Sequence, residues 1–347
     1  MNFDYFAKLV AEQAYPKVDA AEAHDLASGF ADGCTTWFAV NALRAAECEA
    51  RLKDEGDKNR KEQLEQKKRE HERAKNDARR CYMERAVQRP LALPQDLRLD
   101  PWPPQLLNRA RLAMEVEFEL LTSWYSKDDR LFHVLDNPVR KDKIFGVPYM
   151  AAASWKGMLR WACRMQAGLR EHLEQGKRFE DWNDPDWILH LFGNEKGEEK
   201  KFHEGALVFY PTWFDKIGFE VINPHHRSRR AGTQPIYYEV VPGRRPSEND
   251  ESTYEEGGKG RLRLLYAPWP GMKGTMRLAD WLPSFLQAIE DLLTQYGISA
   301  KRTVGWGTAE IKKWKAWRKD TLDGQPIEAD SREKLLERLL PNSGDAS

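Results

Sequence analysis

The chain has 347 residues, enough for one large hydrophobic core or two modest ones. Its 55 lysines and arginines balance its 55 aspartates and glutamates, which excludes a long-range attraction of the whole protein to nucleic acid and leaves local clusters as the route to such binding. No stretch has the length and apolarity of a membrane span, and the first residues lack the order of a secretory signal, so we expect a cytoplasmic protein without a membrane partner.

The first part of the chain, residues 1–89, has a helical pattern with little glycine. Charged residues and alanine dominate Asn41–Ala86, where Leu52 and Leu64 are nearly the only large apolar side chains in the middle of the segment. Because no continuous heptad seam exists, we expect a solvated helical hairpin or a partly disordered arm. Two other interpretations are open. The helix could bind RNA or a partner, or the protein could be a scaffold that binds other proteins through this charged arm.

A proline-rich linker, residues 90–110, follows, because closely spaced prolines cannot continue a helix. The next element is a strand over Leu112–Leu120, in which apolar residues alternate with Ala113 and three glutamates. A period of two predicts one face that packs on a core and a second face that meets solvent.

The remaining elements are a helix from Ser154 through about Leu173, apolar strand-like runs at Ala206–Tyr210, Phe219–Ile222, Ile236–Val241 and Leu262–Tyr266, a second helix over Leu278–Tyr296, and a last strand near Trp306–Trp314. Read coarsely, this order is β-α-β, then β-α-β, and predicts a ferredoxin-like α+β domain over residues 111–320. Two polar, glycine-containing insertions, Asp184–Gly205 and Pro242–Gly260, are expected to be mobile loops. A polar C-terminal tail, residues 321–347, completes the chain.

A turn-rich basic segment runs from Leu135 to the start of the first of these helices. Ser154 suits an N-cap, and Lys156 and Arg160 share an i,i+4 stripe just inside the helix. Free backbone N–H groups at a helix start bind anions, so this stripe, together with Arg140 and Lys141, predicts a contact with phosphate. The alternative is a solvated basic face.

The segment Gly297–Gly307, GISAKRTVGWG, has a second pattern that suits a polyanion. Its glycines would let the backbone approach a phosphate closely, and Lys301 and Arg302 lie beside them.

Three segments carry a resemblance to a known family. Pro148–Arg160, PYMAAASWKGMLR, resembles the P-Y-I-P-G-S-S-L-K-G-x-x-R signature of the RAMP superfamily, the repeat-associated proteins that form the backbone of type III CRISPR effector complexes. Asn223–Val240, NPHHRSRRAGTQPIYYEV, resembles the terminal backbone subunit of the Cmr-type complex. Gly297–Gly307 is similar to the superfamily's loop G-x-G-A-K-T-x-x-G-Y-G, with Ser299 in place of a glycine.

The resemblance covers roughly Leu112–Trp314 and implies the ferredoxin-like fold, CRISPR RNA and target RNA as partners, and other effector subunits in a hetero-oligomer. In RAMP backbone subunits, insertion loops form a thumb that crosses the guide–target duplex. The residues expected to contact RNA are Arg140, Lys141, Ser154, Lys156, Arg160, His225, Arg227, Arg229, Arg230, Lys301, Arg302, Gly305 and Gly307. Guanidinium groups in this set could bind phosphate bidentately or stack on a base.

Asp136 is the main catalytic candidate. The order Asp-Asn-Pro-Val-Arg-Lys over residues 136–141 resembles the segment of target-cleaving RAMP subunits, in which an aspartate precedes a proline and a basic pair. Such a carboxylate could orient a ribose 2′-hydroxyl or hold Mg²⁺ beside a kinked phosphate. The alternative is ordinary Asp-x-Pro turn chemistry, and the terminal Cmr-type subunit generally lacks such an aspartate.

His225 and His226 could relay protons in RNA cleavage, which would make the protein a CRISPR RNA-processing endoribonuclease. The resemblance implies a structural turn there instead. The four cysteines Cys34, Cys48, Cys81 and Cys163 lack CxxC spacing, so we expect reduced structural thiols and neither a zinc site nor a disulfide framework.

The sequence therefore predicts an RNA-binding backbone subunit of a type III CRISPR ribonucleoprotein that binds the RNA backbone and leaves most chemistry to other subunits. A target-RNA endoribonuclease using Asp136, a CRISPR RNA-processing enzyme and a protein scaffold are the alternatives. No cofactor is expected beyond the Mg²⁺ that a catalytic Asp136 would use.

Overall fold

A computed structural model of the chain describes residues 31–89, 91–98, 100, 102–103, 111–128, 133–142, 144–194, 204–223, 225–226, 231–232, 235–247, 254–269, 272, 276–318 and 325–340. The chain forms two compact units. Unit 1 comprises residues 1–91, 127–146 and 217–240, and unit 2 comprises residues 92–126, 147–216 and 241–347. These units differ from the expected boundaries, because two segments assigned to the RAMP domain group with the N-terminal helices.

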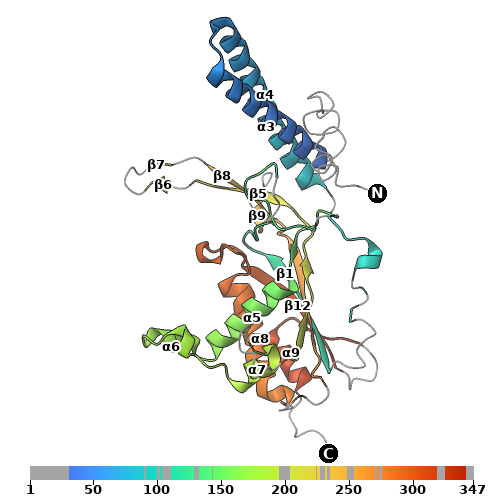
Figure 1. The fold of residues 1–347 in the computed structure, drawn as a ribbon. Helices are drawn as coiled ribbons and strands as arrows, with labels where there is room; N and C mark the ends of the chain where they lie inside the picture. Colours follow the sequence, from blue (N-terminus) through green and yellow to red (C-terminus); the bar gives the residue numbers. More distant parts are fainter. Residues whose placement is uncertain are drawn as a thin grey trace, which may run out of the picture. The chain divides into compact units, whose positions relative to one another are not determined.

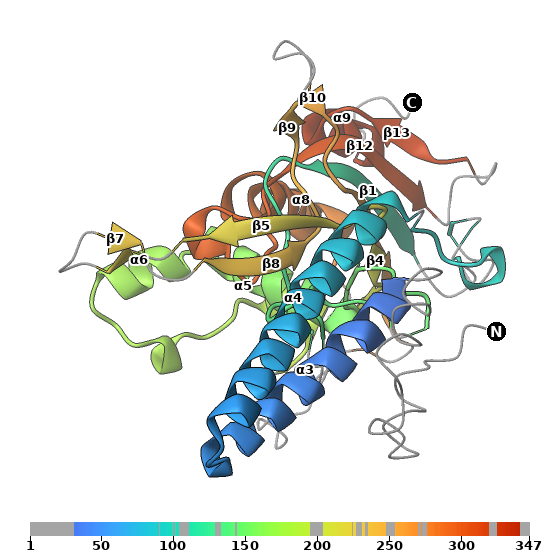
Figure 2. The same ribbon diagram turned by 90° about the horizontal axis from the view of Figure 1, so that it is seen from above.

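Unit 1 is built on a helical hairpin, which confirms the helical N-terminal region (Figure 1). Helix α3 (Ala31–Asp54) and helix α4 (Lys58–Gln88) lie side by side, as the view from above also shows (Figure 2). The Asp57 carboxylate caps α4 by accepting hydrogen bonds from the N–H groups of Asn59 and Arg60. Alanine is the commonest residue of α3, and lysine, arginine and glutamate make up most of α4; all four residue types have high helix propensity.

The hydrophobic core of unit 1 lies at the end of the hairpin remote from its turn. Apolar side chains from α3, from the end of α4 and from two distant segments meet there: Cys34, Phe38, Ala78, Tyr82, Ala86, Leu91, Val134, Leu135 and Ile217. Strands β5 (Gly218–Ile222) and β8 (Ile236–Val240) form an antiparallel pair in this unit. Around the turn between α3 and α4, most side chains of the hairpin are exposed, as the composition of this segment predicts.

Unit 2 contains an antiparallel sheet with the strand order β13-β12-β1-β11-β3. Its strands are β1 (Leu112–Leu120), β3 (Leu207–Phe209), β11 (Lys259–Tyr266), β12 (Ala309–Arg318) and β13 (Ile327–Ala329). Helix α5 (Ala152–Gln166) connects β1 to β3, and helix α8 (Leu278–Asp291), extended by a π-helical turn over Leu292–Tyr296, connects β11 to β12. The α+β fold is therefore confirmed, and the connectivity follows the expected β-α-β, β-α-β order.

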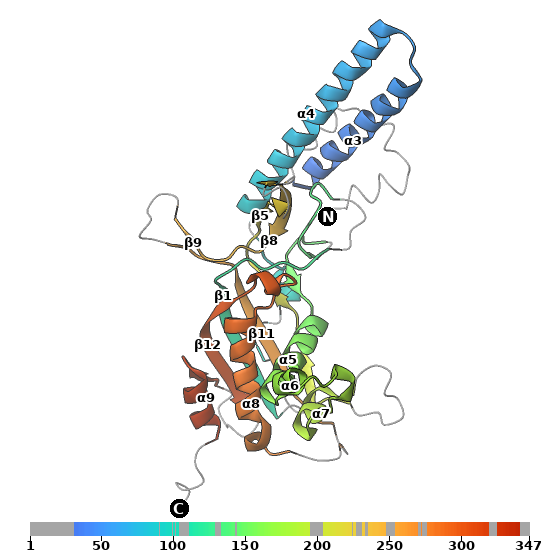
Figure 3. The ribbon, with the colours of Figure 1, turned by 90° about the vertical axis from the view of Figure 1, so that its left-hand side faces the viewer.

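Helices α5 and α8 cover one face of this sheet (Figure 3). Trp155 of α5 packs edge-on against Phe118 of β1, with ring centroids 6.1 Å apart. Trp281 of α8 lies 4.8 Å from the ring of Tyr266 on β11. The four aromatic side chains are buried, so the apolar face of β1 packs as its sequence period predicts.

Several segments differ from the sequence-based expectation. The helix expected over Ser154–Leu173 is divided into α5 and α6 (Leu169–Glu174). The insertion Asp184–Gly205, expected to be a mobile loop, contains helix α7 (Asp186–Phe192), whose Ile188, Leu191 and Phe192 are fully buried. The expected polar tail contains β13 and helix α9 (Arg332–Leu339), because Leu335 and Leu339 supply a buried apolar stripe.

The remaining described strands are short and form three pairs: β2 (Tyr149–Met150) with β4 (Thr212–Trp213), β6 (His225–His226) with β7 (Ala231–Gly232), and β9 (Arg245–Pro246) with β10 (Tyr254–Glu255). The last pair lies in the insertion Pro242–Gly260.

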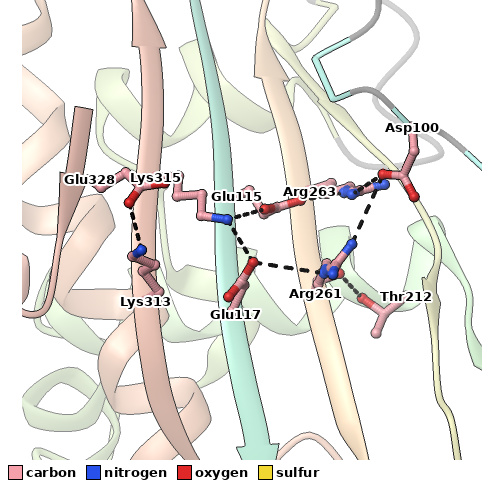
Figure 4. Close-up of polar contacts among 9 residues, drawn as sticks. All are labelled: Asp100, Glu115, Glu117, Thr212, Arg261, Arg263, Lys313, Lys315 and Glu328. Atoms are coloured by element: carbon pink, nitrogen blue, oxygen red, sulfur yellow. Dashed lines mark hydrogen bonds and ion pairs between the residues drawn. The ribbon is translucent and has the colours of Figure 1, made fainter. Parts of the chain in front are cut away.

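The second face of β1 is the main departure from the predicted pattern. Glu115 and Glu119 are each only 4% exposed, although the alternation predicts a solvent-facing row. Arg263 on β11 and Lys315 on β12 bind Glu115 at 2.7 and 3.4 Å, and Lys315 also binds Glu117 at 2.7 Å (Figure 4). Cross-strand cations thus neutralise the glutamates and permit their burial.

We expect Glu115→Ala to lower the free energy of unfolding by about 2–3 kcal/mol, because it leaves two largely buried cations short of a counter-charge. Urea denaturation measures the change. Glu328→Ala is the matched control, since Glu328 pairs with Lys313 on the same sheet but is 40% exposed at its side chain. Its expected loss is below about 1 kcal/mol. Equal losses for the two variants would show that burial of the Glu115 pair does not stabilise the sheet.

Candidate nucleic-acid interface

Helix α5 begins two residues before the expected start. Its N-cap is Ala151, and the N–H of Ser154 donates to the Ala151 carbonyl at 3.0 Å, so Ser154 lies inside the first turn and the N-cap assignment was wrong. The side chain of Ser154 is exposed. No side chain caps α5 among the described residues, and its first turn contains no acidic residue. The helix start therefore keeps the partial positive charge that attracts anions.

Trp155 fixes the position of this helix start on the sheet. Its indole N–H donates to the Thr212 hydroxyl at 2.9 Å, and that hydroxyl donates to the Arg261 carbonyl at 2.6 Å. Because Trp155 and Leu159 point inward, Lys156 and Gly157 lie on the exposed side of α5. Partial burial of the ammonium and the charge of Arg160 lower the pKa of Lys156.

Arg160 does not extend the predicted phosphate-binding stripe. Its guanidinium is largely buried and binds Asp184 at 2.7 Å, and Arg164 binds the other oxygen of the same carboxylate at 2.6 Å. Burial alone would raise the pKa of Asp184, but the hydrogen bonds from the two arginines outweigh it and hold that pKa below its ordinary value. The charge of Arg160 is thus compensated within the protein, which is a correction to the expected pairing of Lys156 with Arg160.

The glycine-rich segment forms a tight loop that is held by the continuation of β1. The Ser299 hydroxyl donates to the Tyr125 carbonyl at 3.1 Å and accepts from the Tyr125 N–H at 3.0 Å. The Trp124 indole N–H donates to the Ile298 carbonyl at 2.9 Å, and the Thr122 hydroxyl donates to the Gly305 carbonyl at 2.9 Å. The serine that replaces a family glycine therefore anchors the loop.

Gly305 and Gly307 both have left-handed backbone angles, with φ of 85° and 90°. A Cβ atom at Gly307 would lie 2.4 Å from the backbone nitrogen of Ser299, whereas a Cβ at Gly305 would meet no heavy atom of the described structure within 4 Å. Gly307 is thus required by the fold of the loop, and Gly305 leaves the outer backbone of the loop open.

A stacked pair brings this loop to α5. The guanidinium carbon of Arg302 lies 4.3 Å from the ring centroid of Trp161 on α5, and Tyr296 packs edge-on against the same ring at 4.8 Å. Lys301 and Arg302 are half-buried. The glycine-rich loop therefore packs against α5, although the two segments are more than a hundred residues apart in the sequence.

The basic turn segment in unit 1 is organised differently from the prediction. Lys141 is 5% exposed at its side chain, and its ammonium binds both carboxylate oxygens of Glu239 at 2.6 Å and the Tyr82 hydroxyl at 2.8 Å. Burial alone would raise the pKa of Glu239, but Lys141, then His133 and Tyr82, hold that pKa below its ordinary value. Lys141 is thus a structural residue and not an exposed phosphate ligand, which corrects its assignment.

The same network shapes the turn that carries Asp136. Oε2 of Glu239 also accepts from the Val139 N–H at 3.1 Å, and the Glu239 N–H donates to the Asn137 carbonyl at 3.0 Å. Asp136 itself is exposed, and Arg140 is half-buried with its Nε donating to the Lys127 carbonyl at 3.3 Å. The turn is therefore rigidly held while its first carboxylate faces solvent.

Other predicted residues lie outside what the structure describes. Arg227, Arg229 and Arg230 are not among the described residues, and His225 and His226 are described only as the backbone of β6, paired with β7. Within the described ranges, no group of three or more histidine, cysteine or acidic side chains could hold a metal ion. None of the described helices is long and apolar enough to cross a membrane.

Sequence reasoning missed the partners that compensate the buried charges. The sequence pattern places Asp184 in an insertion loop, Glu239 in an apolar strand and Tyr82 in the solvated arm. None of these patterns indicates a contact with Arg160 or Lys141. An acidic residue inside an apolar strand, such as Glu239 between Tyr238 and Val240, is the one feature that indicated a buried counter-charge.

Comparison with known proteins places these geometric findings in a family. The family model of the RAMP superfamily matches residues 117–310. A sequence search of curated proteins found no match.

Several solved structures contain a chain that is similar to this one. One is described as "Cryo-EM structure of the Type III-B Cmr-beta bound to cognate target RNA" (TM-score 0.49, 14% identity, 82% of this chain and 92% of that chain). A "Type IV-B CRISPR Complex" has a TM-score of 0.37 at 13% identity over 61% of this chain and 93% of that chain. A "CRISPR RNA-guided surveillance complex, pre-nicking" has a TM-score of 0.38 at 10% identity over 59% and 75%, respectively.

The two loop glycines give a matched pair of substitutions. Gly305→Ala should cost about 1 kcal/mol of stability from backbone strain alone. Gly307→Ala should cost at least about 2 kcal/mol more, because the new methyl group also collides with backbone and cannot be relieved by a rotamer change. Chemical denaturation of both variants decides the point. Similar costs would show that the loop is not held against Ser299.

Proposed function

Because the chain belongs to the RAMP superfamily, we propose that it is an RNA-binding backbone subunit of a type III CRISPR interference ribonucleoprotein. It would hold the CRISPR RNA and its duplex with target RNA in the cytoplasm, as part of a hetero-oligomer with other effector subunits in antiviral defence.

The observation that carries the proposal is that the glycine-rich loop packs against α5, the helix whose start is exposed. The Arg302–Trp161 stack joins the loop to the third turn of α5 at 4.3 Å within unit 2. Lys156 and Gly157 are exposed on the α5 side, and Gly305 is exposed on the loop side. An uncapped helix N-terminus, cations and open glycine backbone together suit the phosphates of a nucleic acid strand.

The position of Gly157 supports this interpretation, because a glycine destabilises the interior of a helix. It lies inside α5, where glycine is about 1 kcal/mol less favourable than alanine. A Cβ atom there would meet no described heavy atom within 4 Å, so the packing of the described protein does not require glycine. Close approach of a ligand backbone next to Lys156 supplies a reason for the missing side chain.

The proposed interface consists of Ser154, Lys156, Gly157, Lys301, Arg302 and Gly305, and Gly307 shapes its loop. Arg160 and Lys141 are left out because Asp184 and Glu239 compensate their charges. Arg140, His225 and the arginines at 227, 229 and 230 remain predictions from the sequence. Since base pairing with the guide supplies target specificity, phosphate and 2′-hydroxyl contacts are sufficient for this role.

Lys156→Ala should weaken binding of guide RNA whatever its sequence. Loss of one phosphate contact should also flatten the dependence of log affinity on log salt by about 0.7–0.9 units. A filter-binding titration over a salt series measures both. Lys177→Ala, which removes an exposed cation from the same unit but outside the interface, is the control and should leave the slope unchanged. An unchanged slope for Lys156→Ala would remove this helix start from the RNA surface.

A second candidate function, cleavage of target RNA by Asp136, has one structural observation in its favour. Asp136 is exposed at the start of a turn whose backbone is held by Glu239. The carboxylate of Asp142, in contrast, accepts hydrogen bonds from the N–H groups of Ile144 and Phe145. A fixed, exposed carboxylate could orient a 2′-hydroxyl or hold Mg²⁺ at a bound RNA. The binding role remains our first proposal, because the turn alone also accounts for this geometry.

Asp136→Asn in an assembled complex distinguishes the two candidates, since it removes charge at nearly constant shape. The binding role predicts an unchanged pattern of target-RNA products at matched guide occupancy with Mg²⁺ present. Loss of a single product band in a side-by-side digest would make Asp136 catalytic and overturn our choice.

A further inference from the structure

Two cysteines 47 positions apart meet at the base of the helical hairpin in unit 1. The Sγ atoms of Cys34 on α3 and Cys81 on α4 are 2.7 Å apart. Cys34 is fully buried and Cys81 is half-buried. Cys34 belongs to the buried core that contains Phe38, Ala78 and Tyr82, and Cys81 packs against this core. The spacing of the cysteines in the sequence gave no sign that these two thiols lie together.

We propose that Cys34 and Cys81 form a redox-active pair, whose oxidation to a disulfide links α3 to α4 at the base of the hairpin. A disulfide bond is about 2.05 Å long, so the two sulfur atoms need to approach by less than about 1 Å. Neighbouring core side chains already hold the two helix segments at this separation, so little backbone movement is required.

The two thiols have different roles in the reaction. Burial, with the hydrogen bond and charge of Cys81, raises the pKa of the Cys34 thiol to about 12. Cys34 is therefore a poor first nucleophile in water, and the more accessible Cys81 reacts first.

The oxidant is a small aliphatic disulfide, such as oxidised glutathione. The Cys81 thiolate attacks one of its sulfurs, forms a mixed disulfide and releases one small thiol. Cys34 then loses its proton and attacks the Cys81 sulfur, which releases the second small thiol. The two cysteines give up two electrons and two protons, and the small disulfide takes them up as two thiols.

The link would close a loop that contains the whole exposed part of the hairpin. A covalent closure of this size restricts the unfolded state, and we expect it to raise the melting temperature of unit 1 by roughly 5–10 °C. The link also lies next to Tyr82, which binds Lys141 and Glu239 beneath the Asp136 turn. Oxidation would thus fix the helices that support this turn, whether or not the protein binds RNA.

The experiment uses the full-length protein, folded and equilibrated with glutathione buffers of increasing oxidised fraction. Remaining thiols are alkylated in denaturant, and tryptic peptides are mapped by mass spectrometry. We expect a peptide pair joined through Cys34 and Cys81, together with alkylated Cys48 and Cys163, and its reversal by reduced glutathione. Thermal melting of the same samples should follow the linked fraction.

Cys48→Ala is the matched control, because Cys48 is a buried cysteine on α3, the helix that also carries Cys34. It should leave the link intact, whereas Cys34→Ala and Cys81→Ala should abolish it. The wild-type peptide map decides the matter even if these last two variants fail to fold. Full alkylation of both cysteines in every buffer would overturn the proposal. So would glutathione adducts on Cys81 alone, or a link from either residue to Cys48.

Discussion

Strand β1 is buried on both faces, and the arrangement of unit 2 depends on this constraint. Its even-numbered residues, Leu112 to Phe118, pack against the helix layer, and its glutamates are neutralised by cations from both neighbouring strands. The pKa of Glu119 falls to about 2, chiefly because Arg244 donates a hydrogen bond to it. Because this central strand is held firmly, it fixes the position of the residues that follow it in the chain.

Both parts of the proposed interface are positioned from that strand. Phe118 packs against Trp155, which places the start of α5. The residues just beyond β1 hold the glycine-rich loop through hydrogen bonds of Trp124 and Tyr125 with Ile298 and Ser299. The Arg302–Trp161 stack then joins the two parts. An interface built on one rigid element needs no ligand to assemble it, which favours binding by a preformed surface.

The structure explains in part why the sequence contains equal numbers of basic and acidic residues. Many cations have internal counter-charges, as Arg160 has Asp184 and Lys141 has Glu239. Such pairs stabilise or orient the fold but contribute little to a field outside it. Basic residues that are exposed near glycines, such as Lys156, are therefore the ones that we propose to contact phosphate.

Local patterns predicted much of the fold, and contacts between distant segments account for what they did not predict. The alternation in Leu112–Leu120 and the periodicity of Leu278–Tyr296 are properties of neighbouring residues, and both elements form where expected. Whether the β1 glutamates are buried depends on which strands lie beside β1, and local sequence patterns do not predict that pairing. The same holds for the site: the glycine-rich loop was predicted from its own residues, whereas the burial of Lys141 and the Cys34–Cys81 pair required the folded chain.

The claim that RNA approaches the exposed start of α5 is tested most directly by Gly157→Ala. Alanine should stabilise the free protein by roughly 0.5–1 kcal/mol, because it removes a helix-interior glycine and meets open space. If an RNA backbone passes close to Gly157, the same methyl group should weaken guide-RNA binding several-fold. The account predicts this opposite movement of melting temperature and RNA affinity. An affinity that stays constant or rises while the melting temperature rises would contradict it.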